Sequence, residues 1–319
     1  MRTSRAKIPE GGCYYHLMNR TAGSAYDYPF GDVERETGMK IVCRLMEYYL
    51  LEFISMCWMG NHFHIVLYVP GDDELPDSSR IAARHNAYYK FNNSKWIDKN
   101  DESACRKIAE RMRDISDFMK IFQQTYTHYM NKRLNRRGRF WADRFKSTIV
   151  EGKDSLMTVI KYVELNPVRA GLAADPADYR HCTWGWFNGS GKHLFSSSFF
   201  RHLRKAFTNH DTENWSEERL TNEFRAELAR TITYEKCNNT EEIERAVKEA
   251  RKGETMPVQF LRRMRHITDG GIIGSKIYVL ETASRFRDKK EVSKKKFSHG
   301  KTASGTDLYC YKQLRRSLV

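Results

Sequence analysis

Two histidines separated by one residue form the first feature of this sequence with an evident chemical use. His62 and His64 follow a Gly-Asn tip at positions 60–61, inside the apolar stretch 51–70. Two apolar runs around such a tip are typical of a β-hairpin. Successive side chains of a strand point to opposite faces, so both imidazoles should project from the same face. This pattern predicts two ligands of a metal site; a pair of buried core histidines is the alternative.

A second candidate region is the most basic part of the chain, residues 132–146, KRLNRRGRFWADRFK. Cations that contact phosphates, interleaved with rings that stack on bases, are typical of proteins that bind single-stranded nucleic acid. We therefore expect Arg139, Arg144 and Lys146 to contact phosphates and Trp141 to contact a base. The alternative is a basic turn before a strand, with aromatic side chains that pack in the core.

A third candidate lies in the segment that begins at Asp154, DSLMTVIKYVELNPVRAGL. Its apolar spacing predicts a helix, and Pro167 disfavours helical geometry at the residue before it. Tyr162 and Asn166 are four residues apart and should share one helix face. The residues alone do not distinguish Tyr162 from the other tyrosines, of which the chain has 17 in all.

The composition narrows the class of partner. Lysine and arginine number 55 against 40 acidic residues, which gives a net charge of +15 and a pI near 9.4. That balance favours a polyanion such as nucleic acid. Seven widely spaced cysteines without a C-x-x-C pair argue against a zinc ribbon, a zinc deaminase or a disulfide scaffold, and indicate a reducing compartment. No signal peptide or long apolar run occurs, so we expect a cytoplasmic, nucleoid-associated protein without membrane contact.

The elements that must position these residues begin with a strand over 13–20 and a helix that starts at Asp32, followed by the hairpin. This order predicts a ferredoxin-like α+β fold, with an antiparallel sheet and helices on one face. His16 lies on the first strand and would reach the histidine face if that strand neighbours the hairpin; a core or hydrogen-bonded histidine is the expected role. Residues 81–133 should be helical with a break near 92–100.

A Gly/Ser-rich break at residues 188–192 suggests a domain boundary, with one domain over 1–190 and a basic helical domain over 191–319. In the second domain, Met256–His266 and Ile272–Arg287 are predicted to be helices around the turn Thr268–Gly271. Two helices around such a turn resemble a helix-turn-helix, and a helical packing appendage is the alternative.

Three motifs in this order and spacing resemble the REP-associated tyrosine transposases, members of the HUH superfamily of single-strand DNA transposases and nickases. They are the H-x-H with its hydrophobic middle residue Phe63, the stretch GRFWADRFKS and the helix end YVELNPVRAGL, and the resemblance covers about residues 7–190. Gly60 departs from the pattern, because relatives often have proline there. A segment similar to TDG-x-x-IGS also follows the catalytic domain in some relatives.

The resemblance implies roles for specific residues. His62 and His64 would bind a divalent cation, Mg or Mn, with Asn166 at the position of a polar third ligand. Tyr162 would be the nucleophile that forms a 5′-phosphotyrosine on single-stranded or hairpin DNA, such as REP-type palindromes. Two imidazoles suit Mn better than Mg. The transesterification needs no ATP, and the sequence has no Walker motif.

Two other functions stay open at this point. One is a plasmid or phage replication nickase of the same superfamily, although no helicase module is visible in the sequence. The other is a catalytically idle DNA-binding regulator derived from a transposase. The sequence also leaves open whether the chain acts as a monomer or a homodimer, and which hairpin it recognises. If Tyr162 were not the nucleophile, Tyr126 and Tyr129 would be the next candidates.

Overall fold

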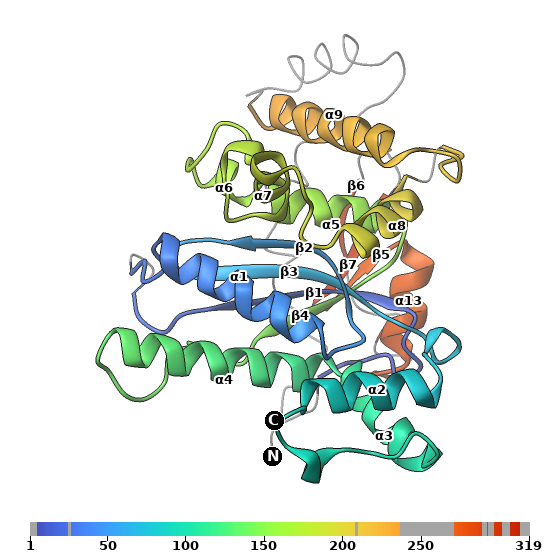
Figure 1. The fold of residues 1–319 in the computed structure, drawn as a ribbon. Coiled ribbons are helices and arrows are strands. Elements are labelled where there is room, and N and C mark those ends of the chain that lie inside the picture. The colour runs from blue at the N-terminus through green and yellow to red at the C-terminus, as the bar shows by residue number, and fades with distance from the viewer. Residues whose placement is uncertain are drawn as a thin grey trace.

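The computed structural model describes residues 5–24, 27–207, 210–236, 271–288, 292, 297–301 and 307–312 of the chain. Within this part, the fold is a mixed sheet flanked by helices (Figure 1). The strands in chain order are β1 (Cys13–Arg20), β2 (Glu52–Trp58), β3 (His62–Val69), β4 (Lys146–Val150), β5 (Gly271–Gly274), β6 (Ser298–Lys301) and β7 (Asp307–Lys312).

These strands form one sheet in the order β2-β3-β1-β4-β5-β7-β6. All neighbouring pairs are antiparallel except β4 and β5, which are parallel. The predicted hairpin is confirmed, since Trp58 of β2 stands opposite Phe63 of β3 and the Met59 N–H donates to the His62 carbonyl at 2.8 Å. The predicted strand over 13–20 is also confirmed as β1, which pairs with β3 and places His16 beside the hairpin.

The α+β character is confirmed, but the prediction that helices cover one face is wrong. Among the described residues, the helices are α1 (Asp32–Met46), α2 (Ser78–Tyr88), α3 (Glu102–Met112), α4 (Ile115–Arg133), α5 (Asp154–Glu164), α6 (Asn166–Arg169), α7 (Thr183–Ser190), α8 (Ser196–Ala206), α9 (Glu217–Lys236) and α13 (Lys276–Ser284). Side chains alternate along β3, with Phe63 and Ile65 in one hydrophobic core and Val66 in a second. Helices α1 and α4 cover the first core, whereas α5, α8 and α9 cover the second (Figure 1).

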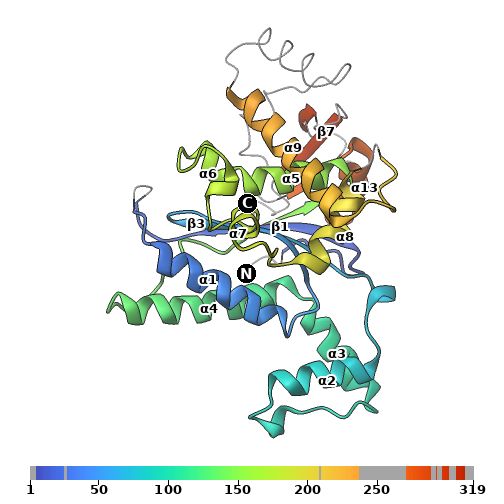
Figure 2. The ribbon, with the colours of Figure 1, turned by 45° about the horizontal axis from the view of Figure 1, so that its top comes forward.

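The helical region before β4 agrees with the expected pattern. It forms α2, α3 and α4, with the predicted break between α2 and α3 and a further short break at 113–114. Asp114 caps α4 by accepting hydrogen bonds from the Ser116 and Asp117 N–H groups. Helices α2 and α3 extend away from the sheet (Figure 2), so α4 is the member of this group that lies under the sheet.

The C-terminal third differs from the prediction of a separate helical domain. Helix α8 follows the predicted boundary directly and packs on β2, where the Ser198 hydroxyl donates to the Phe53 carbonyl. Residues 271–274 form a strand of the same sheet because β5 pairs with β4. The predicted helix Ile272–Arg287 is therefore β5 followed by α13, since short apolar runs fit a buried strand as well as a helix.

The other proposed helix, Met256–His266, and most of the turn Thr268–Gly271 lie outside the described residues. Among the residues that are described, no helix is both long enough and apolar enough to cross a membrane.

Candidate active site

Three histidines lie together on the sheet face that α5 covers. His62 and His64 belong to β3, and the alternation along this strand directs both away from Phe63, which lies in the opposite core. His16 belongs to β1, where it is paired with Val66 of β3, so it lies on the same face. The sheet therefore brings together two histidines that are adjacent in sequence and one that is distant.

His16 and His64 are joined by a hydrogen bond inside the protein. His16 Nε2 and His64 Nδ1 are 2.9 Å apart, and the two rings stack at 5.1 Å between centroids. Both side chains are 1% exposed. This agrees with the expected hydrogen-bonded role of His16. When His64 Nδ1 carries the proton, its Nε2 keeps a lone pair.

His62 has a comparable arrangement at the end of the hairpin. Its Nδ1 lies 2.8 Å from Asn61 Oδ1, which acts as acceptor and leaves the lone pair of His62 on Nε2. Burial, together with the charge of Arg20, lowers the pKa of His62 to about 4. Burial is also the main reason why the pKa of His64 is well below its usual value. Both imidazoles are consequently neutral near pH 7, the state in which they bind a metal.

Helix α5 places Tyr162 over these histidines. The Tyr162 ring lies edge-on to His64 at 5.5 Å and to His16 at 5.8 Å between centroids. Its side chain is buried, at 8% exposure. Two nearby residues of α5 hold this helix in place: Lys161 pairs with Glu227 of α9 at 2.9 Å, and Glu164 accepts a hydrogen bond from the Ser55 hydroxyl at 2.7 Å.

The side chains of Asn166 and Arg169 form hydrogen bonds with the C-terminal end of this helix. Helix α5 ends at Glu164, close to the end that Pro167 predicts, but Asn166 is not excluded from helical geometry and begins the next short helix, α6. The Asn166 Nδ2 donates to the Tyr162 carbonyl at 2.9 Å, which leaves its Oδ1 as the atom that suits a cation. Arg169 Nη1 donates to the same carbonyl at 2.9 Å, and its guanidinium lies 5.1 Å from the centre of the Tyr162 ring.

Sequence reasoning missed Arg169. The available signal is the spacing of seven residues between Tyr162 and Arg169, which places both on one face of a helix that continues through the two positions. Here two successive helices, α5 and α6, contain them. The structure brings this cation over the ring of Tyr162.

The residues present fit a divalent cation in their donor chemistry. His62 and His64 each offer Nε2, and the Nδ1 of each ring is fixed by a second group, as in many metal sites. Among the described residues, no group of three or more His, Cys, Asp or Glu could hold a metal ion. A metal site at His62 and His64 consequently needs an oxygen donor other than a carboxylate. The Asn166 amide is the candidate nearest in sequence to Tyr162.

The basic segment divides into exposed cations and buried rings. Arg139, Arg144 and Lys146 are exposed. Lys146 begins β4 opposite Met18 of β1, which puts it on the histidine face of the sheet. The Arg139 Nε donates to the Trp141 carbonyl at 2.9 Å, so this part of the loop is folded against itself.

The structure does not agree with the expectation that Trp141 presents its ring to a base. Trp141 is 7% exposed and packs in the core beside Phe63 and Phe30. Its indole N–H donates to the Gln123 carbonyl at 3.3 Å. Phe140 and Phe145 are also buried. Burial of large apolar surface outweighs the pattern of alternating cations and rings here.

Comparisons with known proteins add little to this geometry. No family model matches the chain, and no curated protein matches its sequence. Among solved structures, the chain is similar to a REP-associated tyrosine transposase bound to a REP hairpin, with 12% identity and a TM-score of 0.40. The similarity covers 61% of this chain and 90% of that one. A likeness at this level carries no argument about function, which therefore depends on the site itself.

Proposed function

We propose that this protein cleaves and rejoins single-stranded or hairpin DNA through a covalent bond to Tyr162, as a transposase of REP-type palindromes does. The observation that carries the proposal is the position of the Tyr162 ring, edge-on to the imidazoles of His64 and His16 and beside the Arg169 guanidinium. A phenol next to imidazoles that can bind a metal and to a cation is an arrangement that suits an enzyme with a phosphotyrosine intermediate.

A divalent cation, Mg or Mn, would be held by His62, His64 and the Asn166 amide oxygen. When bound, it supplies positive charge to the non-bridging phosphate oxygens and makes the phosphorus more electrophilic. Neutral imidazoles and one amide oxygen leave the net charge of the site positive, which suits an anionic substrate.

The covalent step conserves the number of phosphodiester bonds. The Tyr162 oxygen forms a bond to phosphorus while the bond from phosphorus to the 3′ oxygen breaks. The phenolic proton leaves to solvent, and the departing 3′ oxygen takes up a proton. The DNA is then joined to Tyr162 by a 5′-phosphotyrosine, and attack by a 3′-hydroxyl reverses the step.

Arg169 stabilises the charge that develops in this step. A tyrosine hydroxyl ordinarily ionises near pH 10, so it is a weak nucleophile at neutral pH. A fixed guanidinium over the ring stabilises the phenolate, and its hydrogen bond to the Tyr162 carbonyl keeps it in place. We assign Arg139, Arg144 and Lys146 to phosphates outside the reacting centre.

The deciding experiment is to incubate the purified full chain with a labelled DNA hairpin and Mn, then look for a covalent protein–DNA adduct after denaturation. The expected product is a 5′-phosphotyrosine mapped to Tyr162. Specific hairpin binding without any adduct would favour the idle DNA-binding regulator instead.

A further inference from the structure

An open groove lies on the other face of the sheet, along α4. Its volume is about 550 Å³, and α4, the N-terminal segment and the loop before β4 line it. No aspartate or glutamate belongs to this lining, which includes the cations Arg5, Lys120 and Arg144. A groove of this charge favours an anionic ligand.

Two residues that line the groove each have a polar atom that lacks a partner in the described part of the chain. Gln123 Nε2 and Asn131 Oδ1 are buried, and no other described residue forms a hydrogen bond with either atom. The Asn131 Nδ2 donates to the Gly138 carbonyl at 3.0 Å, so this amide is held with its oxygen left over. Leaving buried polar atoms unpaired is unfavourable, and a ligand with both acceptors and donors would remove the cost.

These two amides belong to one stripe of α4. Lys120, Gln123, Thr127 and Asn131 follow each other at steps of three or four residues and all line the groove. The stripe extends about 16 Å at 1.5 Å per residue. It therefore suits a short extended chain with repeating polar groups better than one compact molecule.

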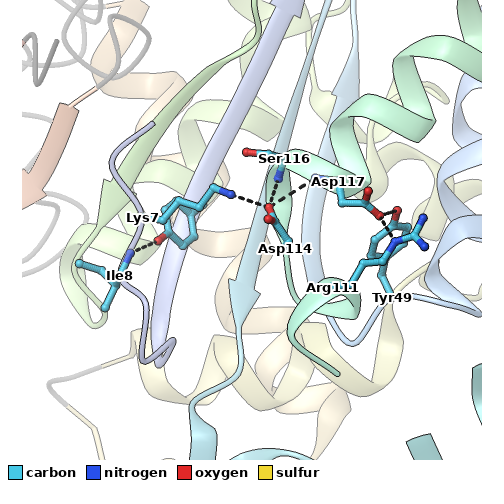
Figure 3. Close-up of polar contacts among 8 residues, drawn as sticks. Lys7, Ile8, Tyr49, Arg111, Asp114, Ser116 and Asp117 are labelled. Carbon is cyan, nitrogen blue, oxygen red and sulfur yellow. Dashed lines mark hydrogen bonds and ion pairs between the residues drawn. The ribbon is translucent and has the colours of Figure 1, made fainter. Parts of the chain in front are cut away.

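The N-terminal segment is fixed against α4, and this positions Arg5. The Lys7 ammonium pairs with Asp114 at 2.6 Å, and the Ile8 N–H donates to the Tyr15 hydroxyl at 2.8 Å (Figure 3). The Arg5 guanidinium lies 3.4 Å from the centre of the Phe145 ring and donates to the Phe145 carbonyl. A cation held in this way loses little further freedom when it meets a phosphate.

The groove and the candidate active site meet at one end of the sheet. Phe145 lines the groove, and the next residue, Lys146, lies on the histidine face. β1 ends and β3 begins at this same end, where Arg20 stands opposite His62. A DNA strand that passes around the start of β4 can contact both the groove and the candidate active site.

We propose that the α4 groove binds unpaired nucleotides adjoining the DNA strand held at Tyr162. Gln123 and Asn131 contact base edges, whose donors and acceptors match amide groups. Arg5, Lys120 and Arg144 contact phosphates. This inference rests on the proposed function for its ligand, but it concerns binding and not the covalent step.

The test uses the full-length protein and two DNA hairpins, one blunt and one with a short single-stranded extension. Binding is measured by fluorescence anisotropy at a fixed salt concentration. The variant Gln123→Ala/Asn131→Ala is compared with Asn93→Ala/Asn100→Ala, which removes two amides outside the groove. At ~3- to 10-fold for each hydrogen bond, the groove variant should bind the extended hairpin ~10- to 100-fold more weakly.

Its affinity for the blunt hairpin should not change, and the control should match the wild type on both DNAs. The melting temperature of the groove variant should change little, because the removal of two unpaired buried atoms offsets the loss of the hydrogen bond from Asn131 to the Gly138 carbonyl. A 5-iodouracil in the extension should cross-link to the tryptic peptide 121–132, which contains both amides.

Unchanged affinity for the extended hairpin, an equal loss on the blunt hairpin, or a cross-link outside 121–132 would overturn the inference. So would a wild-type protein that binds neither DNA. Cross-linking to 121–132 without any adduct at Tyr162 would support the groove while refuting the proposed strand transfer, so the two failures can be distinguished.

Discussion

The Tyr162 ring stands at 87° to the His64 ring, with 5.5 Å between their centroids. One ring comes from helix α5 and the other from strand β3, on opposite sides of the second hydrophobic core. The packing of this core consequently decides whether the phenol and the imidazole meet.

Replacing Tyr162 by phenylalanine should abolish the covalent DNA adduct and leave hairpin binding intact. The ring and its contacts remain, so the free energy of unfolding should change by about 1 kcal/mol or less. Adduct formation is measured on a denaturing gel, and binding by anisotropy.

Tyr126→Phe is the matched control for this variant. Tyr126 is fully buried in the core on the opposite face of the sheet, where its hydroxyl donates to the Glu34 carbonyl. The adduct should persist in this control. An adduct that survives Tyr162→Phe would show that the nucleophile is another residue.

Removing the hydrogen-bond partner of His62 Nδ1 should weaken metal binding directly, so the effect should be measurable without DNA. Without DNA, Asn61→Ala should lower the affinity for Mn by ~10- to 100-fold, because the Nδ1 partner of His62 is lost. His62→Ala should lower it further and stop cleavage, with a trace restored at high Mn concentration. Mn binding is followed by electron paramagnetic resonance.

His128→Ala serves as the control, since this exposed histidine lies on α4. Equal Mn affinity in wild type, Asn61→Ala and His62→Ala would refute the metal site.

The hairpin and the helices around it could be predicted from the sequence, because a Gly-Asn tip and regular apolar spacing are local signals. The hydrogen bond between His16 and His64 could not be predicted, because it depends on the register between β1 and β3. The prediction for Trp141 also failed, since a pattern of rings and cations does not tell which side chains turn inward. β5 was missed because four residues are too few to show a period.

Loss of exposed arginines should reduce the salt dependence of DNA binding. Each phosphate contact on single-stranded DNA contributes about −0.7 to the slope of log K against log salt concentration. Arg139→Ala and Arg144→Ala should each make the slope shallower by about that amount and weaken all sequences alike. Lys107→Ala, an exposed cation on α3, should keep the wild-type slope. Unchanged slopes in both arginine variants would place the phosphate contacts elsewhere.

His193 should make the protein less stable in mild acid. The ring stacks on Phe199 at 3.9 Å, and burial lowers the pKa of His193 from 6.5 to about 3. The unfolded chain thus binds a proton between pH 6.5 and 3 that the folded protein does not, so stability falls as the pH falls through this window. At pH 5, this residue should lower the free energy of unfolding by about 2 kcal/mol.

Urea unfolding at pH 7.5 and pH 5 measures this effect. His193→Phe keeps the stacked ring and removes the titrating group. It should be less stable than wild type at pH 7.5, because the Phe195 N–H loses its acceptor, but its decrease toward pH 5 should be smaller. An identical pH dependence in both proteins would contradict the assignment.

The buried ion pair between Lys161 and Glu227 should be costly to break from one side. Burial raises the pKa of Glu227, but the charges of Lys161 and Arg230 outweigh it and lower the pKa to about 2. Lys161→Met should destabilise the protein by up to about 3–5 kcal/mol, with Arg230 reducing the loss. The double variant Lys161→Met/Glu227→Leu should recover most of it. Additive losses in urea unfolding would show that the pair is not coupled.

The parallel pairing of β4 with β5 has a consequence for biosynthesis. Residues 151–270 separate the two strands in the chain, so β4 is completed long before its neighbour. At about 5–20 residues per second, translation of this interval takes roughly 6–24 s. During that time the nascent sheet has an unprotected edge of the kind that recruits other chains. Chaperone binding to ribosome-bound chains should consequently be strongest after β4 emerges and should decline once β5 has left the exit tunnel.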